Sequence, residues 1–486
     1  MNWITLIAFT CYLTIVVAIA LVAYRLTQNL GDFVLGGRRL SGPTAALSAG
    51  ASDMSAWLLL GLPGAVFTLG LNQIWLPIGL TIGAYLSWRF IAKPLRVYSE
   101  MARDSLTLPA FLDNRFFDES GIIRTLLAFV TLLFFAFYTA SGLVAGALLL
   151  QRFHISYEEA LLLGTLIIVG YTFIGGFLAV SWTDFFQGSF MFICLLVVPF
   201  FAMSEMGGWT ATMESIFELS PEKFNPLKDF NGLLFVNLMA WGLGYFGQPH
   251  ILVRFMAVKT VKDIALARRI CVGWMSFSML GAVFIGFVGI AYFYQHDIHP
   301  ETIFIVFSQK LFAPWLAGVL FAAILSSIMC AIDSQMLASS SALTEDLYHR
   351  WIHPKASPVF LMWIGRLAVV IISCVAVYLA QDPNSRVISL VAFAWAGLGS
   401  AFGPAVIGAL FWRRMTRKGA ICGIVSGALA VIVWDANTGG VFNLYEIIPG
   451  FFFGFLGIII GSLLDAPPEK KVTEQFDRVW RTIKTS

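Results

Sequence analysis

Apolar runs of about 20 residues recur along the whole chain, separated by short polar segments. A helix of that length crosses roughly 30 Å of hydrocarbon, so each run predicts a membrane-spanning helix. Thirteen spans are predicted, over residues 4–24, 43–69, 73–92, 122–150, 158–180, 184–204, 231–253, 270–294, 314–342, 360–380, 387–412, 418–435 and 445–465. The chain is therefore expected to be an all-α integral membrane protein.

Two of these spans contain stretches that should interrupt a helix. The second has small and polar residues from Ser48 to Ser55, and the seventh has three glycines between Trp241 and Pro249. In transporters built from inverted repeats, helices are broken at corresponding positions near the membrane centre, where freed backbone groups bind ions and solutes. Because the breaks fall in spans two and seven, we predict a five-plus-five inverted repeat.

This repeat divides the chain into four parts. Residues 1–42 form a peripheral first helix and a cytoplasmic loop, and residues 43–412 form the transport core. Residues 413–465 add two peripheral helices, and residues 466–486 are a short cytoplasmic tail.

Composition and charge agree with this picture. The chain is 58% apolar and only 12% charged, more apolar than a soluble protein of this size tolerates. With the N-terminus outside and the C-terminus in the cytoplasm, 26 of the 31 Lys and Arg residues fall on the inside, as the positive-inside rule requires. The five on the outside are Arg152, Lys223, Lys228, Lys310 and Arg386.

Several classes of function are disfavoured. The net charge of +3 follows the membrane topology, and no basic domain for nucleic acid is present. The sequence has no P-loop, GxSxG, HExxH or paired-cysteine zinc pattern, so we expect neither an enzyme nor a transition-metal site. The six cysteines all lie in apolar runs and are expected to be free thiols.

Two acidic residues inside spans are candidates for cation or proton binding, since a charge within the membrane is costly unless it is paired or functional. Asp53 lies in the broken second span, where it could alternatively cap a half-helix. Asp333 follows the polar stretch that begins at Ser326 in span nine, near the expected cytoplasmic water boundary. Serine and cysteine in such stretches can equally serve only helix packing.

Aromatic residues near the breaks are candidates for a solute pocket, because Trp and Tyr combine apolar walls with one polar atom. They are Trp57, Tyr138, Trp241 and Tyr245. Trp241 and Tyr245 are four residues apart, which predicts that both face the pocket from one side of a helix. The alternative is that they anchor the protein at the membrane interface.

Two charged residues near span ends are candidates for gating. Arg38 precedes span two on the cytoplasmic side, where it could simply contribute positive-inside charge. Asp184 is expected in a short inside turn between spans five and six, either as a helix cap or as a gate partner.

From about Leu35 to Leu464 these motifs resemble the solute:sodium symporters. The matching stretches are LSAGASDMSAW from Leu47 to Trp57, LGLPGAVF from Leu60, YTFIGGFLAVSWTD ending at Asp184, GLGYFGQPHI from Gly242, LTEDLY from Leu343 and LYEIIPGF from Leu444. The resemblance implies a thirteen-helix inverted-repeat transporter of the bacterial plasma membrane that imports a small amino acid with sodium. L-proline is the first candidate solute.

The resemblance also implies roles for individual residues. The implied sodium contacts are the backbone carbonyls of Ala51 and Met54 and the span-nine positions Ser327, Cys330 and Ala331. Asp53 and Ser55 match positions that handle cation and solute, and Arg38 matches a functionally sensitive arginine. The implied solute pocket comprises Trp57, Tyr138, Trp241, Tyr245 and Pro249. Asp184 and Asp333 are assigned to gating or coupling, and no cofactor is expected.

Two departures from the family pattern stand out. Ala56 replaces a usual glycine, and Cys330 and Ala331 replace two adjacent hydroxyl residues. Sodium prefers oxygen ligands, so a thiol and a methyl group are poor substitutes. Proton coupling through Asp53 or Asp333, weak sodium dependence and a different small solute are therefore alternatives. A solute-sensing membrane protein is another, although the short tail argues against it.

Overall fold

The computed structural model describes residues 3–24, 35–174, 177–227, 231–382 and 385–485. Throughout these ranges the chain forms helices joined by short loops, with one isolated parallel bridge between Leu40 and Val258. The predicted all-α class is confirmed. Lys228, one of the basic residues expected outside, is not among the described residues.

Within the described ranges, nine helical stretches are long and apolar enough to cross a membrane. They are Leu71–Met101, Ile122–Phe153, Val180–Glu205, Asp263–Tyr292, Pro314–Ile352, Pro358–Leu379, Val387–Phe411, Arg417–Asp435 and Ile447–Leu464. A tenth consists of two helices, Gly42–Asp53 and Trp57–Leu69, that meet at an angle of 60°. The multi-pass membrane class follows from these stretches.

The other three predicted spans also fall on helices, but these are not among the ten. They are α1 (Trp3–Tyr24), α9 (Tyr157–Ile174) and the pair formed by α13 (Gly232–Ala240) and α14 (Pro249–Ala257). The count of thirteen spans therefore stays a prediction.

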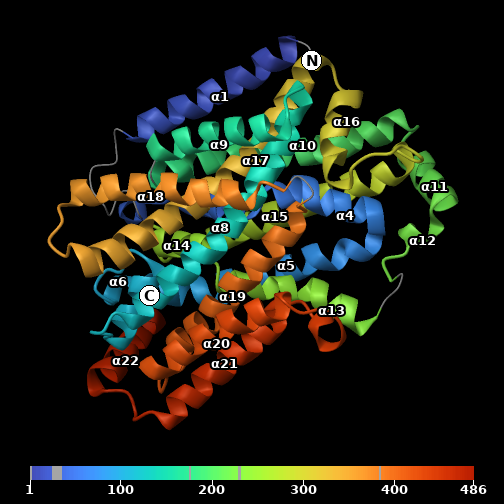
Figure 1. Cartoon of the computed structure of the whole chain (residues 1–486). Coiled ribbons are helices and arrows are strands. Elements are labelled where there is room, and N and C mark those ends of the chain that lie inside the picture. The colour runs from blue at the N-terminus through green and yellow to red at the C-terminus, as the bar shows by residue number, and fades with distance from the viewer. Residues whose placement is uncertain (1–2, 25–34, 175–176, 228–230, 383–384, 486) are drawn as a thin grey trace.

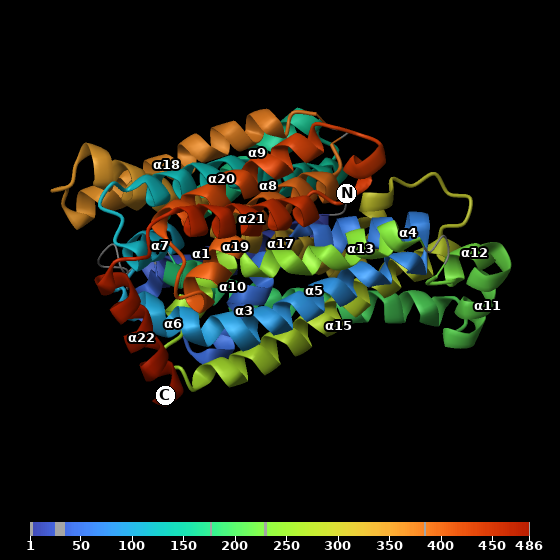
Figure 2. The ribbon, with the colours of Figure 1, turned by 90° about the horizontal axis from the view of Figure 1, so that it is seen from below.

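The other helices of the bundle are labelled in Figure 1, except α3, which Figure 2 labels. They are α3 (Gly42–Asp53), α4 (Leu62–Leu69), α5 (Trp75–Leu86), α8 (Ile122–Leu150), α10 (Phe177–Glu205), α15 (Asp263–Tyr292), α17 (Pro314–Ser341), α18 (Pro358–Leu379), α19 (Val387–Phe411), α20 (Arg417–Asp435) and α21 (Ile447–Leu464). Figure 1 shows α1 at one edge of the bundle and the α20–α21 pair at the opposite edge, with the other long helices between them.

Short helices cover the two ends of the bundle (Figure 2). At one end lie α6 (Ala92–Met101), α7 (Leu108–Phe116) and α22 (Lys470–Thr485). At the other end lie α11 (Trp209–Leu219) and α12 (Pro221–Phe224). A further short helix, α16 (Ile303–Leu311), precedes α17. The tail helix α22 buries a stripe of apolar side chains at helical spacing: Val472, Phe476, Val479 and Ile483. This stripe holds α22 against α6.

Candidate functional site

The break after α3 changes the backbone hydrogen bonds of its last turn. The amide of Ser55 donates to the carbonyl of Asp53 at 2.9 Å, and the amide of Leu58 donates to the carbonyl of Ser55 at 3.0 Å. In a continuous helix these amides would instead bond the carbonyls of Ala51 and Met54, four residues back. The break therefore leaves the Ala51 and Met54 carbonyls without their normal helical donors. These are the oxygens that the family resemblance implies for sodium.

Two aromatic side chains stabilise this break. The indole nitrogen of Trp57 donates to the Asp53 carbonyl at 3.0 Å, and the hydroxyl of Tyr138 in α8 donates to the same oxygen at 3.3 Å. Both side chains are buried. The backbone amide of Trp57 also lies 3.5 Å from the Ser55 hydroxyl. The polar atoms of Trp57 and Tyr138 are thus already engaged by the backbone at the break.

The second interrupted segment meets the first at a carboxylate. The Tyr245 hydroxyl donates to Oδ2 of Asp53, while Oδ1 of Asp53 has no hydrogen-bond partner among the described residues. Tyr245 belongs to a 3-10 segment, Trp241–Phe246, between α13 and α14. Its ring packs edge-on against Trp395 of α19, with the ring centres 5.2 Å apart. One buried acid therefore links the two unwound segments.

The prediction that Trp241 and Tyr245 share one face is wrong. A 3-10 helix has three residues per turn, so residues four apart point in different directions. Trp241 stacks on Tyr445, with ring centres 5.2 Å apart, whereas Tyr245 contacts Asp53. Pro249 occupies the first turn of α14, where its missing amide proton costs nothing.

The span-nine positions implied for sodium lie in the middle of α17. The hydroxyl of Ser327 donates to the Ile324 carbonyl at 2.8 Å, and the thiol of Cys330 donates to Oε1 of Gln187 at 3.0 Å. Ala331 is buried and has only a methyl side chain. Neither position 330 nor position 331 offers a side-chain oxygen to a cation.

The sequence predicted a turn at Asp184, but the structure places this residue within α10, which begins at Phe177. Asp184 is fully buried there, and neighbouring side chains compensate its charge. Nη2 of Arg254 in α14 lies 3.3 Å from Oδ2 of Asp184, and the hydroxyls of Ser48 and Ser52 donate to the same oxygen at 2.7 and 3.1 Å. The pair connects α3, α10 and α14.

Arg254 extends this network to α17. Its Nη2 donates to the Ser334 hydroxyl at 2.6 Å, and its Nε donates to Ser48 at 3.1 Å. The guanidinium also lies over the ring of Phe177, 5.2 Å from its centre. A buried ion pair with this many hydrogen bonds fixes the relative positions of four helices.

Asp333 is buried, because neighbouring helices cover α17 on several sides. Its exposed fraction is 0%, and the Thr172 hydroxyl of α9 donates to its Oδ1. Oδ2 has no hydrogen-bond partner among the described residues.

A cleft reaches this network. Its lining includes Pro249, Arg254 and Ser334 at one end and Thr107 and Asp346 at the other. Thr107 donates to Asp346 at 3.0 Å, and Arg124 of α8 forms ion pairs with Asp346 and Glu345. The cleft thus joins the buried ion pair to a charged cluster near the end of α17.

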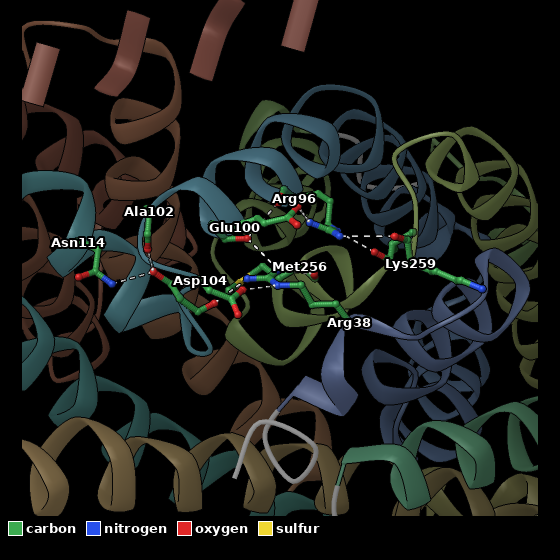
Figure 3. Close-up of polar contacts among 11 residues, drawn as sticks. Arg38, Arg96, Glu100, Ala102, Asp104, Asn114, Met256 and Lys259 are labelled. Atoms are coloured by element: carbon green, nitrogen blue, oxygen red, sulfur yellow. Dashed lines mark hydrogen bonds and ion pairs between the residues drawn. The ribbon is translucent and has the colours of Figure 1, made fainter. Parts of the chain in front are cut away.

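Arg38 holds together the same end of the molecule (Figure 3). Its guanidinium donates to Asp104 at 2.8 Å, to the Met256 carbonyl at 2.6 Å and to the Ser105 carbonyl at 3.0 Å. Arg96 donates to the carbonyl of Val258 at 2.7 Å. Burial lowers the pKa of Arg38 from its usual value. These bonds connect the segment before α3, the loop after α6 and the end of α14.

Sequence reasoning missed four residues of this region: Gln187, Arg254, Trp395, and Tyr12 of α1, whose hydroxyl accepts from Nε2 of Gln187 at 2.8 Å. Arg254 carried a signal, because it is a charge beside the apolar run of span seven. The other three have no distinctive spacing, and their roles depend on contacts between distant helices.

Comparison with known proteins identifies relatives over nearly the whole chain. A model of the sodium:solute symporter family matches residues 33–427. A sodium/proline symporter of Escherichia coli is 48% identical over 479 residues, covering 97% of this chain and 95% of the relative. A sodium/proline symporter of Salmonella typhimurium is 47% identical with the same coverage.

A solved structure supports the fold. It is a Na+-coupled sialic acid symporter in a substrate-bound outward-open state, with a TM-score of 0.81 and 18% sequence identity. The similarity covers 96% of this chain and 99% of that one.

Proposed function

The chain belongs to the sodium:solute symporter family, and we propose on this basis that it imports L-proline with sodium across the bacterial plasma membrane. The observation that carries the proposal is the contact between the two unwound segments at Asp53. Buried backbone carbonyls and a carboxylate at such a junction suit a cation, and nearby aromatic side chains suit a small apolar ring. The relatives named sodium/proline symporters support proline as the solute.

The proposed architecture has thirteen membrane helices, with spans two to six and seven to eleven as inverted repeats. The interrupted segments α3–α4 and α13–α14 each begin one repeat, which is the correspondence expected of such transporters. Residues 43–412 form the core, with residues 1–42 and 413–465 peripheral to it. The N-terminus lies outside, and the tail, residues 466–486, lies in the cytoplasm.

The proposed cation site comprises the carbonyls of Ala51 and Met54 with Asp53, Ser55 and the α17 positions Ser327, Cys330 and Ala331. The proposed solute pocket comprises Trp57, Tyr138, Trp241, Tyr245 and Pro249. Support comes from the freed carbonyls at the first break and from the aromatic side chains around it.

Transport would proceed by alternating access, with one group of helices rocking against the other around the site. Cation binding would favour the conformation that also binds solute, which couples the two fluxes. The Asp184–Arg254 pair and the Arg38 cluster bridge different helices and are proposed to break and re-form during this motion, while Asp333 contributes to coupling. The cleft that ends at Arg254 is the proposed route to the cytoplasm.

A second candidate is a proton-coupled or weakly sodium-dependent importer of proline or another small solute. The thiol and methyl group at positions 330 and 331 favour it, since neither binds sodium well. Asp333, buried with one oxygen unpartnered, would be the proton carrier. In both cases the protein is a transporter without enzymatic activity or a resident cofactor, and its partners are solute, cation and lipid bilayer, not nucleic acid.

Uptake of radiolabelled proline tests the proposal. Vesicles containing the protein would receive an inward gradient of sodium, lithium or protons, one at a time. Accumulation driven by sodium alone supports the first candidate, and accumulation driven by protons alone supports the second. Binding of proline without accumulation under any gradient would contradict transport.

A further inference from the structure

We propose that Gln187 and Tyr12 complete the cation site. The amide oxygen of Gln187 serves as a ligand where α17 lacks hydroxyls, and Tyr12 is the positioning residue that orients this amide. The inference rests on the proposed sodium-coupled function.

Gln187 lies close to both halves of the proposed cation site. A Cβ atom on the next residue, Gly188, would lie 3.0 Å from Cβ of Ala51, so α10 packs directly against the end of α3. Oε1 of Gln187 lies 3.0 Å from Sγ of Cys330 in α17. Consecutive residues of α10 therefore touch both halves of the proposed cation site, at Ala51 and at Cys330.

Hydrogen bonding fixes the direction of the Gln187 amide. The Ser326 hydroxyl bonds both the Tyr12 hydroxyl and the Ala322 carbonyl, the latter at 2.7 Å. Since Ser326 has one proton and the carbonyl can only accept, Tyr12 must donate to Ser326. Tyr12 is then free to accept from Nε2 of Gln187, 2.8 Å away. Oε1 of Gln187 consequently faces Cys330.

The chemistry of the amide oxygen also suits a cation. An amide carbonyl is a hard, neutral oxygen of the kind that binds alkali and alkaline-earth cations in proteins. Its partner without a cation is a thiol, which is a weak hydrogen-bond donor. Exchanging this thiol for a cation would therefore cost little. All three side chains are buried, so no bulk water competes for the oxygen.

The inference gives α1 a role in coupling. Tyr12 lies on α1, outside the predicted repeats, yet its hydroxyl is two hydrogen bonds from the Cys330 thiol. A helix at the edge of the bundle (Figure 1) thereby tunes cation affinity in the core.

The test measures proline uptake against sodium concentration for Tyr12→Phe and Gln187→Leu. Loss of a positioning hydrogen bond typically weakens metal sites by about tenfold or more, so Tyr12→Phe should raise half-saturating sodium by about tenfold. Gln187→Leu should raise it further, and Gln187→Glu, which keeps an oxygen, should restore the response. The half-saturating proline concentration at saturating sodium should not change. Thr14→Val, which removes an exposed hydroxyl of α1, is the matched control and should behave like the native protein.

An unchanged half-saturating sodium concentration in Tyr12→Phe and Gln187→Leu would overturn the inference. If Gln187→Leu fails to reach the membrane, Tyr12→Phe decides alone, since it removes a single hydroxyl. Thermal stabilisation of the purified protein by sodium, without proline, separates this inference from the proposed function. If the native protein is stabilised by sodium but transports no proline, only the function fails. If both variants keep the native stabilisation, the inference fails whatever the solute.

Discussion

Asp53 connects the two unwound segments through its carboxylate, which accepts from Tyr245, while its carbonyl accepts from Trp57 within the first segment. Asp53→Asn keeps the volume and the acceptor for Tyr245 but removes the negative charge. We expect this variant to reach the membrane and to lose concentrative proline uptake, because the cation then lacks its charged partner. Uptake into cells and membrane abundance measured together would test this. Glu214→Gln, at an exposed carboxylate of α11, is a suitable control, and full accumulation by Asp53→Asn would show that Asp53 only caps the helix.

The thiol and methyl group at positions 330 and 331 lead to a second prediction. Cys330→Ser combined with Ala331→Thr would supply two hydroxyl oxygens to the proposed sodium site. Half-saturating sodium for uptake should fall by about tenfold, equivalent to about 1.4 kcal/mol of binding free energy. A native protein that already responds to low sodium, and does not change with the replacement, would mean that other oxygens, such as Oε1 of Gln187, complete the site or that the cation binds elsewhere.

At the residue scale, the sequence was informative only where a residue was chemically unusual for its surroundings. Asp53 was recognisable as an acid within an apolar helix, and the structure places it against Tyr245. Asp184 was noticed for the same reason but was assigned to a turn. Its burial within a helix depends on Arg254, and this partner lies 70 residues away in the sequence. Gln187 and Tyr12 are ordinary residues whose contact depends on the packing of α1 against α10.

At the scale of elements, the interrupted helix α13–α14 depends on a close approach to α19. A Cβ atom on Gly244 would lie 2.0 Å from Nε1 of Trp395, and this nitrogen already donates to the Trp241 carbonyl at 2.8 Å. The indole therefore cannot move aside without losing that bond. Gly244→Ala should destabilise the protein by about 1–3 kcal/mol, as overpacking usually does, and should impair uptake.

Thermal unfolding and uptake of Gly244→Ala would test this expectation. Gly232→Ala at the start of α13 is the matched control, since a Cβ there meets no atom within 4 Å. Native stability and uptake in both variants would show that α19 does not constrain the interrupted segment.

The helical class and ten of the apolar spans, counting the bent pair as one, were predictable from the sequence because runs of apolar residues directly set the length of membrane helices. The conformation inside an interrupted segment was not. Three glycines and a proline indicate that a helix is disturbed, but they do not distinguish a 3-10 turn from an α-turn. The packing partner Trp395 selects the conformation, and it lies 154 residues from Trp241. The predicted common face of Trp241 and Tyr245 failed for this reason.

At the scale of the whole molecule, hydropathy and charge describe how the chain crosses the membrane, one helix after another. They do not describe which helices touch. Figure 1 shows α1 and the α20–α21 pair at opposite edges of the bundle. The hydrogen bonds of Tyr12 nevertheless extend from α1 into the centre, so a peripheral helix can still influence the site. Such a connection is invisible to periodicity, because it depends on one hydroxyl between two helices.

The Arg38 cluster gives the last prediction, since it joins three separate segments at one end of the bundle (Figure 3). The Asp104 side chain is 68% exposed, and exposed ion pairs contribute only about 0–1 kcal/mol. The bonds from Arg38 to the carbonyls of Met256 and Ser105 are partly buried and leave unsatisfied groups when lost. Arg38→Gln should therefore lower maximal proline uptake by about tenfold or more, whereas Asp104→Asn should lower it by less than about threefold. Initial uptake rates at saturating proline and sodium, normalised to membrane abundance, measure both. Both variants remove the ion pair, but only Arg38→Gln also removes the contacts to the carbonyls of Met256 and Ser105. Equal losses of uptake in the two variants would therefore show that the ion pair, rather than the carbonyl contacts, joins the segments at this end of the bundle.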